Sequence, residues 1–326
     1  MSRPHALDVT LLALQPAHAP AAASLVCARV RALREVVREL PDAWTDETTV
    51  ARLIAEIAVR GSGLAAVSSG RLVGFQAATL IDGHGGRWAY TPDFAHAATG
   101  DRAGRIVESL YARLAEGWAR EACLEHVVTT IAGDDEATRT LVRLGFGETV
   151  IDLVRDLGPV RGLRRMPGLV VRRAGPDDAG AVLDLDLGLR RHLAASPVFL
   201  RMGPASPPEL HRRALADPAQ ATFLAEAGGR PIAMLRIGPS ATDVATIVRD
   251  PGTASITSAF TVQDRRGDGV ATHLLDAALG WAREAGFARA AVDHESANGE
   301  AFRFWGRHFT PVAVSLARRL PARVAP

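Results

Sequence analysis

Residues 117–122 read Gly-Trp-Ala-Arg-Glu-Ala, and the same six residues return at positions 280–285. A repeat of this kind sets the architecture of a chain, because each copy forms one structural unit. The two halves also match on both sides of the hexapeptide, at a nearly constant offset. Matched positions lie 159 to 164 residues apart and include Gly70 with Gly229 and Glu136 with Glu300. The sequence therefore predicts one fold used twice.

The two copies are predicted to span residues 1–157 and 168–326, with a linker at residues 158–167 that contains Gly, Pro and Arg. Hydrophobic periodicity gives the same order of elements in each. A short strand leads into helices, two strands follow around a tight turn, and a further strand enters a long helix. A strand, a helix and a closing strand complete the copy. The strands expected in the second copy are residues 169–173, 222–225, 232–237, 254–262, 290–293 and 312–317.

The composition excludes several classes of protein. The 326 residues include 38 basic side chains, all of them arginine, and 36 acidic ones, for a net charge of +2. Positive and negative side chains are interspersed, and no block of five or six like charges occurs. We therefore expect neither nucleic acid nor a membrane surface as a partner. Two cysteines, Cys27 and Cys123, are too few for a disulfide framework or a metal cluster. The longest apolar run near the start, residues 11–14, is too short for a signal peptide. We therefore expect a cytoplasmic protein without a metal.

The segment that carries chemistry is residues 257–271, Thr-Ser-Ala-Phe-Thr-Val-Gln-Asp-Arg-Arg-Gly-Asp-Gly-Val-Ala. A predicted strand feeds a turn with the pattern Arg266-x-x-Gly269-x-Ala271, and the turn opens a helix. Glycine and alanine let an anion approach the backbone, and a helix start presents unpaired N–H groups at the positive end of its dipole. The pattern predicts a cradle for a phosphate group.

Further along, the second copy reads Asn298-x-x-Ala301-x-x-Phe304-Trp305 before its closing strand. In order and spacing, the second half of the chain resembles the GCN5-related N-acetyltransferase (GNAT) superfamily. The resemblance implies an α/β (α+β) fold class, with two tandem GNAT-like domains that each have a mixed, mostly antiparallel sheet flanked by helices. It also implies acetyl-CoA as the co-substrate.

The resemblance further implies where acetyl-CoA binds. The cofactor would lie between the strand ending at Val262 and the strand ending at Asp293. Backbone N–H groups of the turn would hold the pyrophosphate, Asn298 would lie along the pantetheine arm, and an N–H near Phe260 would polarise the thioester. The cofactor-binding residues implied are Phe260, Thr261, Val262, Arg266, Gly267, Asp268, Gly269, Val270, Ala271, Asn298 and Trp305.

Proton transfer is where the sequence departs from the family. Trp305 stands where many members have a tyrosine that protonates the leaving thiolate, and an indole N–H cannot release a proton near neutral pH. The only tyrosines, Tyr90 and Tyr111, are in the first copy. The candidate catalytic residues are instead His294 and Glu295 at the end of a predicted strand. The alternative is that both simply face solvent.

The first copy lacks the phosphate pattern. Alignment on the hexapeptide places Ala103, Ile106 and Glu108 where the second copy has Arg266, Gly269 and Ala271. A branched side chain and a carboxylate would obstruct and repel a pyrophosphate. We therefore expect a degenerate GNAT-like domain that no longer binds the cofactor. His96 is expected to be a packing residue, with a place in the acceptor cleft as the alternative.

The leading hypothesis for function is an N-acyltransferase that moves an acetyl group from acetyl-CoA to a small-molecule amine by direct attack in the second copy. Trp305 motivates an alternative, a catalytically silent acyl-CoA-binding sensor or partner module, and a third reading is a pair of vestigial structural domains. Residues 189–220 normally shape the acceptor side of the site in this superfamily. Their arginines predict either a cationic lid for an anionic acceptor or an ordinary solvated surface. These are Arg190, Arg191, Arg201, Arg212 and Arg213.

Overall fold

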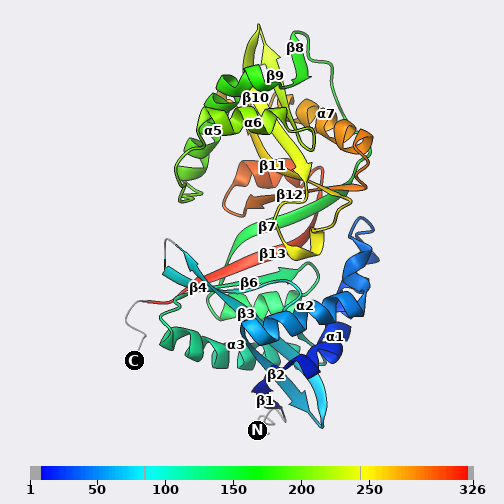
Figure 1. The fold of residues 1–326 in the computed structure, drawn as a ribbon, viewed down its shortest axis with the longest axis vertical. Coiled ribbons are helices and arrows are strands. Elements are labelled where there is room, and N and C mark those ends of the chain that lie inside the picture. Colours follow the sequence, from blue (N-terminus) through cyan, green and yellow to red (C-terminus); the bar gives the residue numbers. More distant parts are fainter. Residues whose placement is uncertain (1–8, 84–85, 243, 322–326) are drawn as a thin grey trace, which may run out of the picture. The chain divides into compact units, whose positions relative to one another are not determined.

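The computed structural model describes residues 9–83, 86–242 and 244–321. Their contacts sort the chain into two compact units, each with helices and a sheet (Figure 1). The first unit contains Met1–Ile151, Ala245–Ile247 and Pro311–Pro326. The second contains Asp152–Val244 and Val248–Thr310.

The sheet of the first unit runs in the order β1-β2-β3-β4-β6-β13, and β5 pairs with β3 outside that order. The strands are β1 (Thr10–Ala13), β2 (Ser62–Ser68), β3 (Arg71–Gly83), β4 (Gly86–Thr91), β5 (His96–Ala98), β6 (Glu125–Ile131) and β13 (Thr310–Arg319). Strands β4 and β6 are parallel, whereas β1–β2, β2–β3, β3–β4, β3–β5 and β6–β13 are antiparallel.

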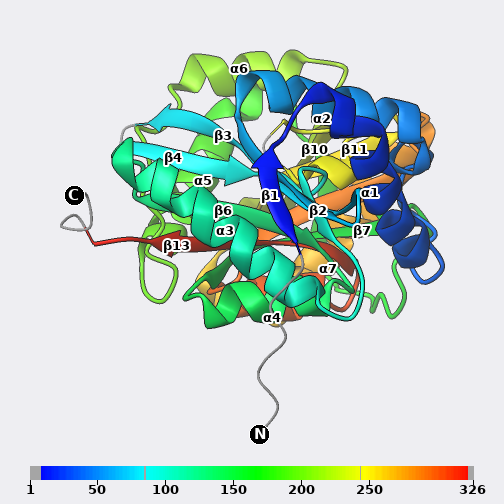
Figure 2. The ribbon, with the colours of Figure 1, turned by 90° about the horizontal axis from the view of Figure 1, so that it is seen from below.

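Two pairs of helices cover this sheet (Figure 2). Helices α1 (Ala19–Arg34) and α2 (Glu47–Arg60) pack on one face, and α3 (Ala103–Arg120) and α4 (Asp135–Arg143) pack on the other. Helix α3 buries Val107, Tyr111, Leu114 and Trp118, which recur every three or four residues and so form one apolar stripe. This stripe, with side chains of α4 and the sheet, makes the core of the unit.

The second unit repeats the plan. Its strands are β8 (Leu169–Arg173), β9 (Ala221–Ala227), β10 (Arg230–Pro239), β11 (Thr253–Thr261) and β12 (Arg289–Glu295), side by side in that order. Only the β11–β12 pair of this set is parallel. Helices α5 (Ala179–Ala194) and α6 (Pro208–Ala216) pack over Leu224 and Met234. The remaining helices are α7 (Val270–Glu284), which packs against β9 and β10, and α8 (Gly299–Trp305).

The ends of the two copies are exchanged between the compact units. β13 closes the second copy in sequence, yet it pairs with β6 of the first unit from Ala313↔Ile131 to Arg319↔Glu125. β7 (Gly147–Asp156) closes the first copy in sequence, and its residues from Asp152 onward belong to the second unit. The sequence boundaries at 157 and 168 therefore describe the repeat, whereas the contacts group the chain differently.

The predicted fold class is confirmed, because each unit has a mixed, mostly antiparallel sheet flanked by helices. Predicted strands appear at their expected places, most of them one to three residues longer at their ends. The sequence did not predict β5 as a separate strand. It forms because Pro92 interrupts the line that continues from β4.

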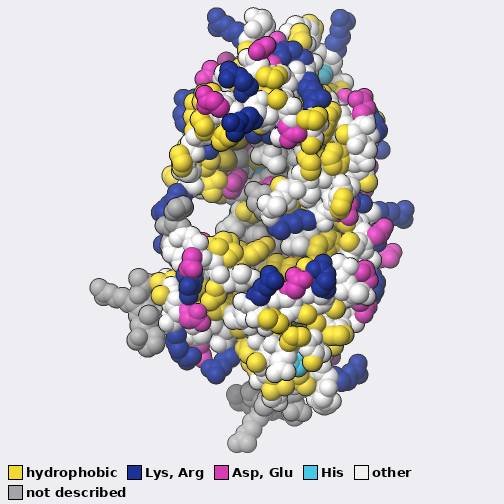
Figure 3. Space-filling model, in the orientation of Figure 1, with side chains coloured by type: hydrophobic (Ala, Val, Ile, Leu, Met, Phe, Trp, Pro, Cys, Tyr) yellow, Lys and Arg dark blue, Asp and Glu magenta, His cyan; other side chains and the backbone are white. Residues whose placement is uncertain are grey.

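Arginine and acidic side chains are intermixed on the face drawn in Figure 3. Within the described residues, no helix is both long enough and apolar enough to span a bilayer.

Candidate active site

A wedge opens between β11 and β12. The two strands pair over Thr253↔Arg289 to Ile256↔Val292 and then separate. The register between β10 and β11 shifts at the same point, so that Thr257 is an extra residue on β11. A bulge of this kind bends its strand and interrupts pairing. The edge of β11 from Thr257 to Thr261 is thereby left with backbone groups that β12 does not use in its described register.

The turn after β11 has the backbone that the phosphate pattern predicts. Gly267 and Gly269 have φ of +85° and +96°, a region that other residues rarely adopt. Gly269 is the N-cap of α7, and its carbonyl accepts from the N–H of Thr272 at 3.0 Å. The N–H groups of Gly269, Val270 and Ala271 therefore precede the helical hydrogen bonds and point out of the helix start. This turn is suited to hold an anion.

Wedge and turn share one cavity of about 490 Å³, within the usual range for small-molecule sites. Nine residues implied by the resemblance line it: Phe260, Thr261, Arg266, Gly267, Gly269, Val270, Ala271, Asn298 and Trp305. Val262 and Asp268 do not. Val262 donates its N–H to Ile232 O at 3.0 Å, and Asp268 pairs with Arg265 at 3.3 Å.

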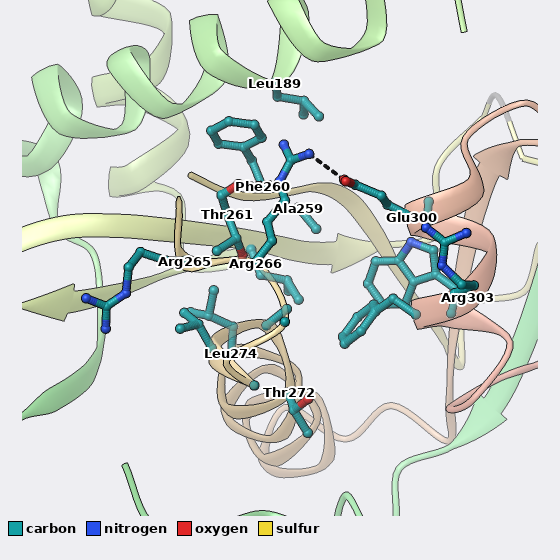
Figure 4. Close-up of a pocket in the computed structure, with 18 of the residues that line it drawn as sticks. Leu189, Ala259, Phe260, Thr261, Arg265, Arg266, Thr272, Leu274, Glu300 and Arg303 are labelled. Carbon is teal, nitrogen blue, oxygen red and sulfur yellow. Dashed lines mark hydrogen bonds and ion pairs between the residues drawn. The ribbon is translucent and has the colours of Figure 1, made fainter. Parts of the chain in front are cut away.

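Arg266 crosses the cavity toward α8 (Figure 4). Its Nε donates to Thr261 O at 3.0 Å, its guanidinium lies 5.4 Å from the ring centre of Phe260, and it forms an ion pair with Glu300. His192 Nδ1 lies 3.5 Å from the same guanidinium. Glu300 balances the charge of Arg266, whereas the N–H groups of the turn and the side chains of Arg303 and Arg307 add positive potential at the cavity wall.

The first turn of α8 supplies an amide. Asn298 is only 8% exposed, and its Oδ1 accepts from Ala301 N at 3.1 Å as the helix N-cap. Its Nδ2 group remains a donor at the cavity wall. At the other end of α8, Trp305 is buried against Phe304 and Phe309 with ring centres 4.7 and 5.5 Å away.

The two candidate catalytic residues do not line this cavity. His294 is 4% exposed, its Nδ1 donates to Glu295 O at 3.0 Å, and its ring packs against Phe302 at 6.1 Å. Glu295 is half-buried and its carbonyl also accepts from Asn298 N at 2.9 Å. Both residues help to form the turn between β12 and α8, and their catalytic role stays a prediction.

Several wall residues were not among those predicted. They are Leu189, His192, Met234, Leu235, Ala259, Arg265, Thr272, Leu274, Glu300, Ala301, Arg303, Phe304 and Arg307. The sequence did contain a hint of a role for Glu300, because this residue matches Glu136 in the repeat and follows a helix cap. The sequence contained no such hint for His192, because only the tertiary fold brings this residue of α5 to the cavity.

The arginines of the segment 189–220 divide into two groups. Arg190 donates to Gly203 O within the segment, and Arg191 Nε donates to Leu187 O at 3.2 Å, one turn earlier on α5. Arg201, Arg212 and Arg213 are exposed.

The corresponding wedge of the first unit is bridged by its own side chains. β4 and β6 pair as far as Thr91↔Val128, and beyond this point His96 on β5 donates from Nε2 to Thr129 O at 2.9 Å. Arg29 from α1 donates to His96 O and pairs with Asp134. Burial and then the charge of Arg29 lower the pKa of His96 to about 4, so the ring is neutral at pH 7. His96 is thus the packing residue that we expected.

A carboxylate occupies the helix start of the first unit. Glu136 Oε1 accepts from Gly104 N at 2.9 Å in the first turn of α3. A Cβ at position 104 would lie 2.8 Å from that oxygen, so a larger residue there would make the Glu136 side chain shift. Helix α3 begins at Ala103, and the residues aligned with the phosphate turn are therefore helical.

Comparisons with known proteins agree with this geometry. Residues 190–309 match the model of the acetyltransferase (GNAT) family. A GCN5-related N-acetyltransferase from Sphaerobacter thermophilus is 17% identical with a TM-score of 0.56, over 98% of this chain and 97% of that chain. A tandem GNAT protein from the clavulanic acid biosynthesis pathway is 15% identical with a TM-score of 0.50, over 96% and 98%. No curated protein matches the sequence. The described residues hold no cluster of His, Cys, Asp and Glu suited to a metal ion.

Proposed function

We propose that this chain transfers an acetyl group from acetyl-CoA to a small-molecule amine. The proposal rests on its tandem GNAT fold and on the match of residues 190–309 to the acetyltransferase (GNAT) family model. The site of transfer is the wedge of the second unit. The observation that carries the proposal is the joining, in one cavity, of the free edge of β11 and the turn at Gly267 and Gly269. The acceptor, the acyl group and the cytoplasmic location are part of the proposal.

Different groups of the cavity bind different parts of acetyl-CoA. The N–H groups from Gly267 to Ala271 hold the pyrophosphate, and the free edge of β11 pairs with the amides of the pantetheine arm. Asn298 Nδ2 donates to the same arm. Acetyl-CoA supplies the acyl group as a thioester. An N–H of β11 beyond the bulge, at Ser258 to Phe260, donates to the thioester oxygen and stabilises the charge that develops there during direct attack.

The first unit, in this proposal, does not bind the cofactor. His96 spans its wedge, and Glu136 already supplies the negative charge at the start of α3. The first unit then contributes to the protein as a structural partner of the second.

A calorimetric titration with acetyl-CoA tests whether the protein binds the cofactor. Measuring thiol release from acetyl-CoA over a panel of amines tests the catalytic half. We expect one binding site per chain and release that depends on the amine. Tight binding without amine-dependent release would instead favour the silent sensor, and an absence of binding would leave the vestigial structural role.

Trp305→Tyr should raise the rate of amine-dependent thiol release by about tenfold, since a phenol that donates a proton typically contributes this much or more. Position 305 lines the cavity at the end of α8, where the ring reaches the wedge. Trp305→Phe is the matched control, because it removes the indole without supplying an O–H. Equal rates for the two variants would show that the thiolate is not protonated from position 305.

A further inference from the structure

A row of polar side chains crosses the second unit's sheet beneath α5 and α6. Thr222 on β9 stands opposite Arg236 on β10, and Arg236 stands opposite Ser258 on β11. Two residues away on β10 and β11, Met234 and Phe260 belong to the apolar cluster under α5. Because side chains alternate between the faces of a sheet, the polar row lies on the same face as this cluster.

Several polar atoms of this row have no partner. Arg236 Nε donates to Thr222 Oγ1 at 3.3 Å, but Arg236 Nη2 and Ser258 Oγ are buried and find no hydrogen-bond partner in the part of the chain that the structure describes. His211 on α6 is 4% exposed, and its Nε2 is likewise buried and unpartnered among the described residues. Buried polar groups are nearly always hydrogen-bonded, and an unpaired one is costly. Three such atoms in one cluster leave three hydrogen-bonding positions unfilled among the described residues.

The groups of this cluster act on one another electrostatically. Burial lowers the pKa of His211 and of Arg236, while the carboxylate of Asp186 on α5 opposes both shifts. The charge of Arg236 further lowers the pKa of His211. His211 also hydrogen-bonds the backbone of Ser206, which leaves Nε2 of the neutral ring as an acceptor. The cluster therefore offers donors at Arg236 and Ser258 and an acceptor at His211.

This cluster lies beside the closed end of the wedge. The β11–β12 pairing ends at Ile256↔Val292, and Ser258 follows two residues later. A pantetheine arm that enters at the Gly269 turn and runs along β11 toward its N-terminal end therefore ends close to Ser258. Arg236 and Ser258 do not line the cavity themselves, but their chain neighbours Leu235 and Ala259 do.

Resting on the proposed acyl transfer, we infer that the acceptor is an amine of the amino-acid class, whose carboxylate binds Arg236 Nη2 and Ser258 Oγ while its amino group donates to His211 Nε2. One guanidinium with Asp186 nearby matches a single negative charge better than a phosphate dianion. In the reaction the amine nitrogen forms a bond to the acyl carbon, the carbon–sulfur bond breaks, and the proton lost by the amine ends on the sulfur.

The experiment compares L-amino acids with their α-carboxamides as acceptors, since each pair differs only in the charged group. We expect the wild type to prefer the carboxylate. Arg236→Met should lower kcat/KM for the amino acids by about 10- to 100-fold, which is the usual worth of a hydrogen bond to a charged group. The same variant should lower kcat/KM for the carboxamides by less than tenfold, because an uncharged carbonyl accepts a weaker hydrogen bond, and it should leave the affinity for acetyl-CoA unchanged. Arg230→Met, an exposed position on the same strand, is the matched control.

The inference is overturned if the wild type prefers the carboxamides or if Arg236→Met affects both members of each pair alike. Thermal stabilisation of the CoA-loaded protein by the same compounds gives a second measurement that needs no turnover. Stabilisation by amino acids that is lost in Arg236→Met, without any transfer, would support the subsite and contradict the transferase. Transfer to uncharged amines alone, without stabilisation by amino acids, would support the transferase and contradict the subsite.

Discussion

Affinity for acetyl-CoA should fall about 100-fold or more when Ala271 is replaced by glutamate. The new carboxylate would lie in the first turn of α7, among the N–H groups that we propose hold the pyrophosphate. It would compete for those groups and repel the phosphates, and a loss of about 3 kcal/mol corresponds to a factor of more than 100. The fold should not suffer, because a negative charge at a helix start is favourable by about 0.3–1 kcal/mol. Calorimetric titration and thermal melting measure the two effects separately.

Ala271→Gln is the control for this substitution, since glutamine has nearly the same size and no charge. Its affinity should fall by about tenfold at most. Unchanged binding in Ala271→Glu would place the cofactor elsewhere. The aligned residue in the first copy is Glu108, so the substitution also asks whether that difference alone is enough to abolish binding.

Acid should destabilise the first unit by about 3 kcal/mol between pH 6.5 and pH 4 through His96 alone. Burial and Arg29 lower the pKa of this ring from 6.5 to about 4 in the folded protein. Above pH 6.5 neither state is protonated and the full stability is present. As the pH falls below 6.5, the unfolded state binds a proton that the folded state excludes, and stability is lost at about 1.4 kcal/mol per pH unit.

His96→Gln should flatten this dependence, because glutamine can still donate to Thr129 O but does not titrate. Urea unfolding at pH 5 and pH 7 measures the difference in the free energy of unfolding, and hydrogen exchange of β5 and β6 locates it. His273→Gln, a change on α7 where the ring Nε2 donates to Arg164 O at 2.9 Å, should keep the wild-type slope. The same slope in His96→Gln and in the wild type would contradict the assigned pKa and the bridging role.

The elements of the fold were largely predictable, because each depends on local patterns. The hexapeptide at residues 117–122 and 280–285 indicated the duplication, and alternation located most strands. The exchange of β13 was not predictable. A strand of alternating apolar residues fits the edge of either sheet, and only its pairing with β6 decides between them.

The candidate site was predictable where function depends on backbone conformation. The Arg266-x-x-Gly269-x-Ala271 pattern predicted a backbone cradle at the helix start, and the turn there has positive φ at Gly267 and Gly269. Side-chain positions depend on cross-strand register, which the sequence does not display. For this reason the sequence did not show that the ring of His294 packs against Phe302, and its catalytic role stays a prediction. Arg236 likewise gave no signal in the sequence, although it stands opposite Ser258.

The place of β13 in the first unit has a consequence for synthesis. A chain emerging from the ribosome has made every other described element of the first unit before β13 appears. Until then β6 lacks the neighbour that covers its edge, and an uncovered strand edge invites pairing with other chains. The two halves of the gene cannot be separated at residue 157 and still give each product a complete sheet.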